Sequence, residues 1–203
     1  VRDLSGHLPD LGGAGLSALD GLRDLDIAAL PAVDEPVRIG PCLSHEPNFY
    51  AVGLNYNEHA AELDAEPPAA PILFSKAASS LSGPFDALTL PRTSEKADWE
   101  VELGVVIGRT ALYVSEEDAL DHVAGYCVVN DISERAFQLE HGGQWMKGKS
   151  APGFGPVGPW LVTADDIGDP QTLALSTRLN GKVMQSSSTS DMIFPVAKII
   201  SYM

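Results

Sequence analysis

The chain has 203 residues, of which 13 are Lys or Arg and 28 are Asp or Glu, so its formal net charge is −15. This acidity disfavours binding to nucleic acids or anionic membranes, because phosphate recognition needs clustered basic side chains. Hydrophobic residues make up 44% of the sequence, which is enough for a globular core. With only Cys42 and Cys127, neither a disulfide framework nor a Cys-based zinc site is expected, and the apolar runs are too short to span a membrane. We therefore expect a cytoplasmic globular protein.

The first 45 residues differ from the rest of the chain in composition. Residues 11–30 are rich in Gly, Ala, Ser and Leu and predict a helix, while the prolines at 31, 36 and 41 predict an irregular connection. We therefore expect a small N-terminal domain with a linker over 1–45 and a larger domain over 46–203. Because the sequence begins at Val1 rather than at an initiator Met, we also expect residues to precede it.

Beyond residue 46 the pattern predicts short strands and short helices. Expected strands cover 49–54, 71–76, 98–107 and 125–130, and expected helices cover 55–63, 115–123 and 195–203. Residues 173–179 alternate in polarity and meet Asn180-Gly181, a pair typical of type I′ hairpins. The predicted class is therefore mixed α/β, mainly β, with short helices.

An acidic strand is the most informative segment. Asp98, Glu100 and Glu102 lie on one face of a strand, because side chains alternate between faces. The strand continues into the apolar run 104–108, which favours an interior position where neighbouring carboxylates need a compensating cation. All-oxygen ligands suit Mg²⁺, Mn²⁺ or Ca²⁺. A solvated acidic face explains the same spacing equally well, so the strand alone leaves both interpretations open.

A third carboxylate and a helical His–Glu pair strengthen the case for a site. Asp131 follows a predicted strand, where it either projects into a cleft or caps a turn. His59 and Glu62 are three residues apart and share one face of the predicted helix. A carboxylate that orients an imidazole makes a general base suited to activating water, although a surface ion pair has the same spacing.

A glycine-rich segment contributes two lysines. Residues 143–150 match the letters of a phosphate-binding loop. Trp145, Met146 and Lys147 are too bulky for a phosphate cradle, however, and the prolines and glycines that follow exclude the required helix. We therefore reject nucleotide binding. A lysine in a mobile loop would instead hold a carboxylate or an enolate oxygen near an acidic metal site.

In order and spacing, these segments resemble the fumarylacetoacetate hydrolase family over residues 46–203. The matching segments are Gly53-Leu54-Asn55-Tyr56 with His59 and Glu62, Asp98 to Leu103, Asn130 to Ser133 with Arg135 and Gln138, Lys147 to Ser150, Gly158 to Val162, Asn180-Gly181, and Thr189 to Ile193. Family members continue with a segment containing Thr-Gly-Thr-Pro that closes the site, so we expect the chain to continue beyond Met203.

The resemblance implies a β-roll catalytic domain over 46–203, a small N-terminal domain and a homodimer. It also implies a small-molecule oxoacid substrate and Mg²⁺ or Mn²⁺ as the cofactor. By residue-by-residue match, the metal ligands are Glu100, Glu102 and Asp131, the water-activating pair is His59 and Glu62, the substrate-contacting residues are Lys149, Gln138 and Thr189, and Asp98 supports the ligands. Neither a nucleic acid nor a membrane is expected as a partner.

The reaction that these residues favour is hydrolytic cleavage of a carbon–carbon bond in a 2,4-dioxo acid, either an acylpyruvate or a diketo-deoxy sugar acid. His59, oriented by Glu62, would deprotonate a water molecule that attacks C4. Cleavage of C3–C4 would leave a metal-bound enolate of pyruvate, which Lys149 also stabilises.

Other reactions use the same intermediate. Residues 133–138 and 142–145 resemble family members that act on diketo-deoxy sugar acids or are ureidoglycolate lyases, so the lyase is the first alternative. An isomerase or decarboxylase of hydroxymuconate-type acids is the next. A non-catalytic binding module is disfavoured, because a site without chemistry has no reason to keep so many like charges together.

Overall fold

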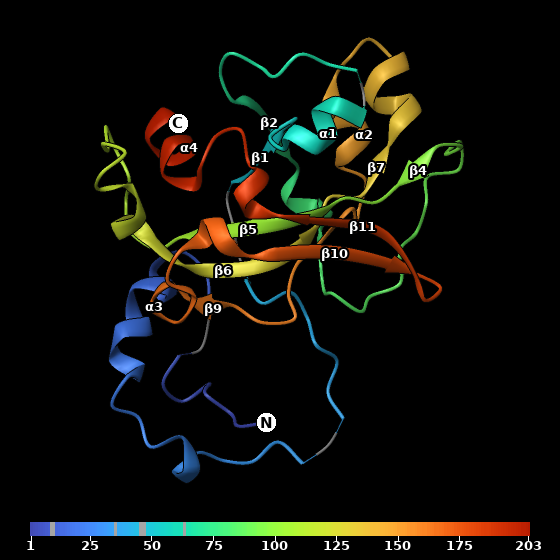
Figure 1. Cartoon of the computed structure of the whole chain (residues 1–203). Coiled ribbons are helices and arrows are strands. Elements are labelled where there is room, and N and C mark those ends of the chain that lie inside the picture. Colours follow the sequence, from blue (N-terminus) through green and yellow to red (C-terminus); the bar gives the residue numbers. More distant parts are fainter. Residues whose placement is uncertain (9–10, 35, 45–47, 63) are drawn as a thin grey trace.

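The computed structural model describes residues 1–8, 11–34, 36–44, 48–62 and 64–203 (Figure 1). The strands are β1 Phe49–Gly53, β2 Ile72–Lys76, β3 Leu81–Ser82, β4 Ala97–Asp98, β5 Val101–Ile107, β6 Val123–Asn130, β7 Ser133–Glu134, β8 Gly155–Pro156, β9 Val162–Thr163, β10 Ala174–Leu179 and β11 Lys182–Ser188. The α-helices are α1 Asn57–Glu62, α2 Trp145–Lys149, α3 Ala164–Ile167 and α4 Val196–Tyr202. Short 3₁₀ helices are Gly13–Leu22, Ile27–Ala29, Ala78–Ser80, Ala119–His122, Pro170–Thr172 and Thr189–Asp191, and Ala136–Glu140 forms a π-helix.

The sheets are small and mostly antiparallel. The largest has the order β5-β6-β9, and β1-β2, β4-β7 and β10-β11 form separate antiparallel pairs, whereas β3-β8 is parallel. In Figure 1, β5 and β6 cross the centre beside the β10-β11 hairpin, with α1, α2 and the β1-β2 pair above them and the N-terminal segment below. Strands exceed helices, which confirms the predicted mixed, mainly β class with short helices. None of the described helices combines the length and apolarity needed to cross a bilayer.

The N-terminal segment packs on the central sheet. Leu16 and Leu43 join a buried cluster with Val106 of β5 and with Cys127 and Val129 of β6. The helix predicted over 11–30 is instead two 3₁₀ helices, because the glycines in this stretch weaken an α-helix. The predicted boundary between residues 45 and 46 lies outside the described residues, so the division into two domains stays a prediction.

Most predicted elements of the main body are present. The strands at 49–54, 71–76 and 125–130 correspond to β1, β2 and β6, and the helices at 55–63 and 195–203 correspond to α1 and α4, with Leu63 outside the described residues. Asn180 and Gly181 both have positive φ, at 50° and 82°, as the predicted type I′ turn requires.

Two predicted elements were wrong. The strand over 98–107 is interrupted at Trp99 and Glu100, because β4 pairs with β7 whereas β5 pairs with β6. The helix over 115–123 is reduced to the 3₁₀ turn at 119–122. Its first residues form a turn in which the Ser115 hydroxyl accepts a hydrogen bond from the Asp118 N–H at 3.2 Å, as at a helix N-cap, but only the short 3₁₀ turn follows.

The helix α2 replaces the mobile loop that the sequence predicted, and glycines hold it close to its neighbours. The Trp145 ring lies on Gly53 at the end of β1 and meets the Phe74 ring of β2 edge-on, with 5.5 Å between centroids. Gly148 faces Gln138 so closely that a Cβ there would lie 2.5 Å from the Gln138 Cβ. The last residue of α2, Lys149, is therefore directed inward and is only 3% exposed.

Replacing Gly53 by Ala tests this packing. A Cβ at position 53 would lie 2.2 Å from Cζ3 of Trp145, so the ring and α2 must move. We expect Gly53→Ala to lower the free energy of unfolding by about 1–3 kcal/mol, measured by urea denaturation followed by tryptophan fluorescence. Gly21→Ala is the control, because a Cβ there meets no atom within 4 Å. Equal stability of the two variants would show that Trp145 does not rest on β1.

A buried carboxylate fixes the chain around β7. Glu134 accepts hydrogen bonds from the Ser94 hydroxyl, from the Lys96 N–H at 3.0 Å and from the Ala136 N–H at 3.2 Å. Burial alone would raise the pKa of Glu134, but these hydrogen bonds outweigh it and hold the pKa below its ordinary value of 4.5. The ionised carboxylate thus stabilises the folded state fully at pH values above 4.5. This stabilisation is lost as the pH falls through the lowered pKa of the folded state.

We therefore expect Glu134→Gln to lower the free energy of unfolding by about 1–3 kcal/mol near neutral pH. The difference from the wild type should shrink as the pH falls below about 4, where the wild-type side chain also becomes neutral. Urea denaturation over a pH series measures it, with the exposed Glu117→Gln as the control. If the difference in the free energy of unfolding between the two proteins did not change with pH, the ionised Glu134 carboxylate would not be the source of the stabilisation.

Candidate active site

Two acidic residues come together where β4, β5 and β6 meet. Glu100 lies in the link between β4 and β5, and Asp131 directly follows β6. The Asp131 N–H donates to the Glu100 carbonyl at 2.8 Å, and the Glu100 N–H donates to Oδ1 of Asn130 at 3.2 Å. Both acidic side chains are buried. Backbone hydrogen bonds therefore place the two carboxylates side by side.

Basic side chains surround these two carboxylates. Nζ of Lys149 lies 2.5 Å from Oε2 of Glu100 and 2.7 Å from Oδ2 of Asp131. Nζ of Lys76, at the end of β2, lies 2.5 Å from Oδ1 of Asp131 and also donates to the Lys149 carbonyl. Arg135 contacts the other oxygen of Glu100, Oε1, at 2.7 Å and holds Oδ2 of Asp98 through Nε at 2.9 Å and Nη2 at 2.7 Å.

The charges of this cluster shift one another's pKa values. Burial disfavours the ionised form of Glu100, but Lys149 and Arg135 outweigh that effect and bring its pKa to about 2. Burial lowers the pKa of Lys76, although Asp131 opposes the shift. Burial likewise disfavours the charge on Arg135, yet Glu100 and Asp98 raise its pKa. Pairing thus favours the ionised forms of Glu100 and Arg135.

Glu102 and Tyr56 differ from the rest because they lack partners. Within the described part of the chain, the Glu102 carboxylate makes neither a hydrogen bond nor an ion pair, and the buried Tyr56 hydroxyl has no hydrogen-bond partner. Burial, then Glu100, then Asp131 raise the pKa of Glu102 to about 8. Burial, followed by the charges of Glu102 and Asp191, raises the pKa of Tyr56. Among the described residues, the Tyr56 hydroxyl is thus a buried polar group without a partner, and the half-buried Glu102 carboxylate is unpaired.

These residues fit a divalent metal ion. Oε2 of Glu100 and Oδ2 of Asp131 both contact the Lys149 ammonium, so they already face one cation position, and unpaired Glu102 lies in their field. Carboxylate oxygens are the ligands that Mg²⁺ and Mn²⁺ prefer. The described residues contain no ready group of three or more His, Cys, Asp or Glu side chains arranged around a metal. The assignment of Glu100, Glu102 and Asp131 as ligands stays a prediction.

The predicted water-activating pair lies together on α1. Nδ1 of His59 is 3.6 Å from Oε2 of Glu62, and both side chains are accessible, at 34% and 77% exposure. The start of α1 is tied to the Thr189–Asp191 turn, because the Asn57 amide donates to the Asp191 carbonyl at 2.8 Å and the Glu58 N–H donates to Oδ2 of Asp191 at 2.9 Å. None of the described interactions joins this pair to the carboxylate cluster, so its role stays a prediction.

Of the other predicted residues, Gln138 and Thr189 are buried and Asp98 is half-buried. Oε1 of Gln138, in the π-helix, accepts from Nη1 of Arg135 at 3.1 Å. Thr189 Oγ1 accepts from the Leu173 N–H at 2.9 Å and thus joins the 3₁₀ turn to the start of β10. Asp98 touches Arg135 and reaches Glu100 only through it. Contact of Gln138 or Thr189 with a substrate, and support of the ligands by Asp98, remain predictions.

Lys76 is the residue that sequence reasoning missed. It was treated only as the end of a strand, although β2 alternates and Lys76 falls on the same face as Ile72 and Phe74. A lysine on the inward face of a strand is a signal of a buried partner. Arg135 was recognised in the family pattern but received no role, and the structure places it against both Asp98 and Glu100.

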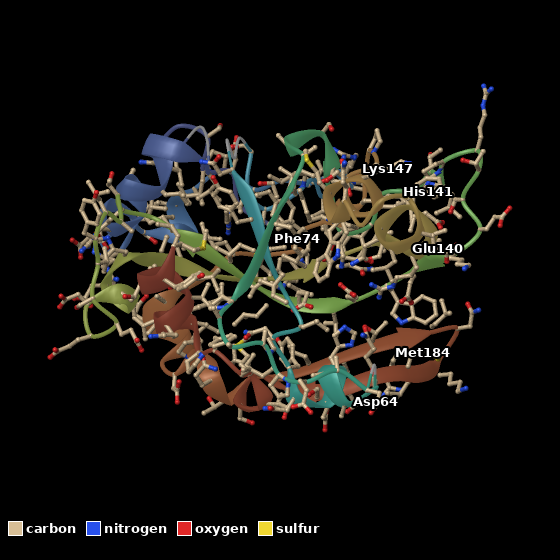
Figure 2. All side chains as sticks on the ribbon, turned by 90° about the horizontal axis from the view of Figure 1, so that it is seen from above. Asp64, Phe74, Glu140, His141, Lys147 and Met184 are labelled. Atoms are coloured by element: carbon tan, nitrogen blue, oxygen red, sulfur yellow. The ribbon has the colours of Figure 1, made fainter. Side chains whose placement is uncertain are left out.

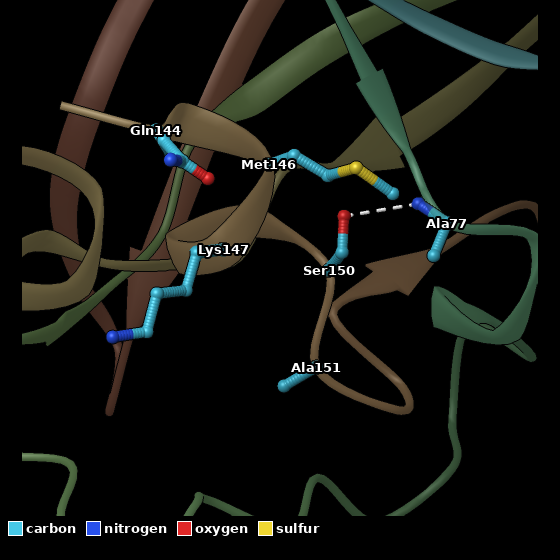
Figure 3. A pocket seen from close by; sticks show the side chains of 6 residues that line it. All are labelled: Ala77, Gln144, Met146, Lys147, Ser150 and Ala151. Carbon is cyan, nitrogen blue, oxygen red and sulfur yellow. Dashed lines mark hydrogen bonds between the residues drawn. The ribbon is translucent and has the colours of Figure 1, made fainter. Parts of the chain in front are cut away.

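A shallow hollow of about 410 Å³ opens on the outer side of α2 (Figure 3). Its lining consists of Ala77, Gln144, Met146, Lys147, Ser150 and Ala151, and the dashed line marks the hydrogen bond from the Ala77 N–H to the Ser150 hydroxyl at 2.9 Å. Helical spacing puts Lys147 on a different side of α2 from Lys149. In Figure 2, Lys147 accordingly lies with His141 and Glu140 at the edge of the molecule.

Comparison with known proteins extends the geometric findings. The family model described as fumarylacetoacetate (FAA) hydrolase C-terminal matches residues 48–203. A protein from Burkholderia lata with a provisional hydrolase name is 52% identical over 205 residues, which cover 100% of this chain and 73% of the relative.

Comparison with solved structures points to the same family. A fumarylacetoacetate hydrolase from psychrophilic Exiguobacterium antarcticum is 34% identical, with a TM-score of 0.83, over 98% of this chain and 72% of that one. A 5-carboxymethyl-2-hydroxymuconate delta-isomerase from Mycobacterium smegmatis is 35% identical, with a TM-score of 0.68, over 76% of this chain and 58% of that one. This chain therefore belongs to the fumarylacetoacetate hydrolase family.

Proposed function

We propose that this protein is a divalent-metal-dependent hydrolase that cleaves a carbon–carbon bond of a 2,4-dioxo acid, an acylpyruvate or a diketo-deoxy sugar acid, and releases pyruvate. Family membership supports an enzyme of the hydrolase and isomerase type. The observation that carries the proposal is the convergence of Glu100 and Asp131 on one cation position, with the unpaired Glu102 beside them and the Lys149 ammonium between them.

Enzymes of this family generally use divalent metal ions. Here Glu100, Glu102 and Asp131 would hold Mg²⁺ or Mn²⁺. When bound, such an ion supplies a Lewis acid that polarises the carboxylate and 2-oxo group of the substrate. Arg135 supports this ligand set, because its contact with Glu100 favours the ionised carboxylate and holds it in place. Asp98 in turn orients Arg135 through two hydrogen bonds.

The remaining groups handle the proton and the leaving fragment. His59 accepts a proton from water, and the nearby Glu62 carboxylate stabilises the imidazolium. The water oxygen bonds to C4 and the C3–C4 bond breaks, which leaves its electron pair on the pyruvate fragment as an enolate. The Lys149 ammonium neutralises the enolate oxygen, and a proton returned by His59 to C3 completes pyruvate. Gln138 and Thr189 are proposed to contact the substrate.

Glu102→Gln tests the metal site most cleanly, because this side chain has no ion pair to break within the described residues. We expect wild-type protein to melt at a higher temperature with Mg²⁺ or Mn²⁺ and higher still with added oxalate, an enolate mimic. Glu102→Gln should lose at least tenfold in metal affinity and should melt without metal like the wild type. The exposed Glu66→Gln is the control. Undiminished metal stabilisation in Glu102→Gln would refute the ligand assignment.

His59→Ala tests the chemical step separately. It should keep metal and oxalate stabilisation and release pyruvate from acylpyruvates about 10²- to 10⁴-fold more slowly, because the general base is lost. A coupled pyruvate assay over a panel of acylpyruvates and diketo-deoxy acids measures it, with the exposed His7→Ala as the control. Turnover by His59→Ala within about twofold of the wild type would remove His59 from the mechanism.

The second candidate is an isomerase of hydroxymuconate-type acids. It is favoured by the structural relatives named 5-carboxymethyl-2-hydroxymuconate delta-isomerase and 2-hydroxyhepta-2,4-diene-1,7-dioate isomerase. Isomerisation needs the same polarised 2-oxo acid but moves a proton and cleaves no bond between carbons. Ultraviolet spectra of a hydroxymuconate-type acid, read together with the pyruvate assay, distinguish the two reactions.

A further inference from the structure

Two buried lysines hold the oxygens that the proposed metal ion requires. Lys76 and Lys149 each donate to a different oxygen of Asp131, at 2.5 and 2.7 Å, and Lys149 also contacts Glu100 at 2.5 Å. Both lysine residues are only 3% exposed. The acidic cluster is therefore already neutralised by protein cations.

A divalent ion and these ammonium groups would compete for the same two carboxylates. An ion bound to Oε2 of Glu100 and Oδ2 of Asp131 would take the place of the Lys149 ammonium and would repel Lys76 nearby. Both lysines have flexible stems that allow the ammonium to turn while the backbone stays in place. Arg135 differs, because two hydrogen bonds to Asp98 hold it outside the pair.

We propose that Lys149 occupies the metal position of the empty enzyme while Lys76 neutralises the other oxygen of Asp131, and that binding of a divalent ion would displace both ammonium groups and turn them toward the anionic oxygens of the oxoacid. The inference rests on the proposed function and adds Lys76 to the residues that bind the substrate. It has a thermodynamic consequence. Metal and oxoacid reinforce each other's binding, because the ammonium groups are free for the oxoacid only after the ion has replaced them.

Lysine labelling in the wild-type protein tests the displacement without any substitution. The protein is treated with a limiting amine-reactive reagent, with and without saturating Mg²⁺, and labelled peptides are quantified by mass spectrometry. We expect Mg²⁺ to raise the labelling rate of Lys76 and Lys149 at least fivefold and oxalate to suppress it again. Lys147, exposed on the same helix, is the internal control and should not change. Unchanged labelling of both lysines under saturating Mg²⁺ would overturn the proposal.

Metal titration of substituted proteins gives a second test. Lys76→Met and Lys149→Met should each bind Mg²⁺ at least tenfold more tightly than the wild type in calorimetry, because no ammonium has to leave. The factor by which oxalate increases Mg²⁺ affinity should be at least tenfold smaller in each variant than in the wild type. Lys147→Met is the matched control. Equal or weaker Mg²⁺ binding by folded Lys76→Met would mean that the lysines shape the metal site instead of competing for it, and would overturn the proposal.

The two proposals fail in different ways. If the wild type binds neither Mg²⁺ nor Mn²⁺, the proposed function falls, and this inference falls with it. If the wild type binds the ion and releases pyruvate, but the lysines stay protected and their removal does not tighten binding, only this inference falls. Where Lys149→Met does not fold, the labelling result and Lys76→Met still decide.

Discussion

A single ammonium group shared by two buried carboxylates organises this molecule. Nζ of Lys149 joins Glu100, in the link between β4 and β5, to Asp131, at the end of β6. Removing one member of such a triad leaves an uncompensated charge in the interior, which is far more costly than losing a surface ion pair. Helix α2 is consequently held against the central sheet by charge at one end and by the Trp145 ring at the other.

The cluster is close to electrical balance, and this explains how so acidic a chain builds a site without a basic surface. Carboxylates and basic side chains pair almost one to one around Asp131, and the pKa of the unpaired Glu102, raised to about 8, favours its uncharged form near neutral pH. Under the proposed function, a divalent cation would replace the lysine ammonium groups at these carboxylates, and the released ammonium groups would then meet the anionic substrate. Both features are compatible with the proposed metal-dependent oxoacid hydrolase.

The sequence predicted local features well and relationships between distant segments less well. The hairpin at Asn180-Gly181 and the position of Asp131 after a strand depend on neighbouring residues, and both were found as expected. The interruption at Trp99 and the burial of Lys149 depend on partners far along the chain, so no local pattern could reveal them. Lys76 was visible in principle, as a charged residue on the inward face of an alternating strand. Strand alternation suggested the grouping of the acidic residues around 98–102, whereas the assignment of Glu100, Glu102 and Asp131 as metal ligands came from the family resemblance.

The change of partner strand at Trp99 and Glu100 has an evolutionary consequence. Because the Asp131 N–H bonds to the Glu100 carbonyl and the Glu100 N–H bonds to the Asn130 side chain, the carboxylates are fixed locally, and the surrounding connections can change in length or sequence without moving them. When the carboxylates are fixed in this way, changes in the surrounding loops can alter the substrate while the central residues stay in place. Related proteins can then diverge in substrate. Relatives with hydrolase and isomerase names on the same scaffold are what such divergence leads one to expect.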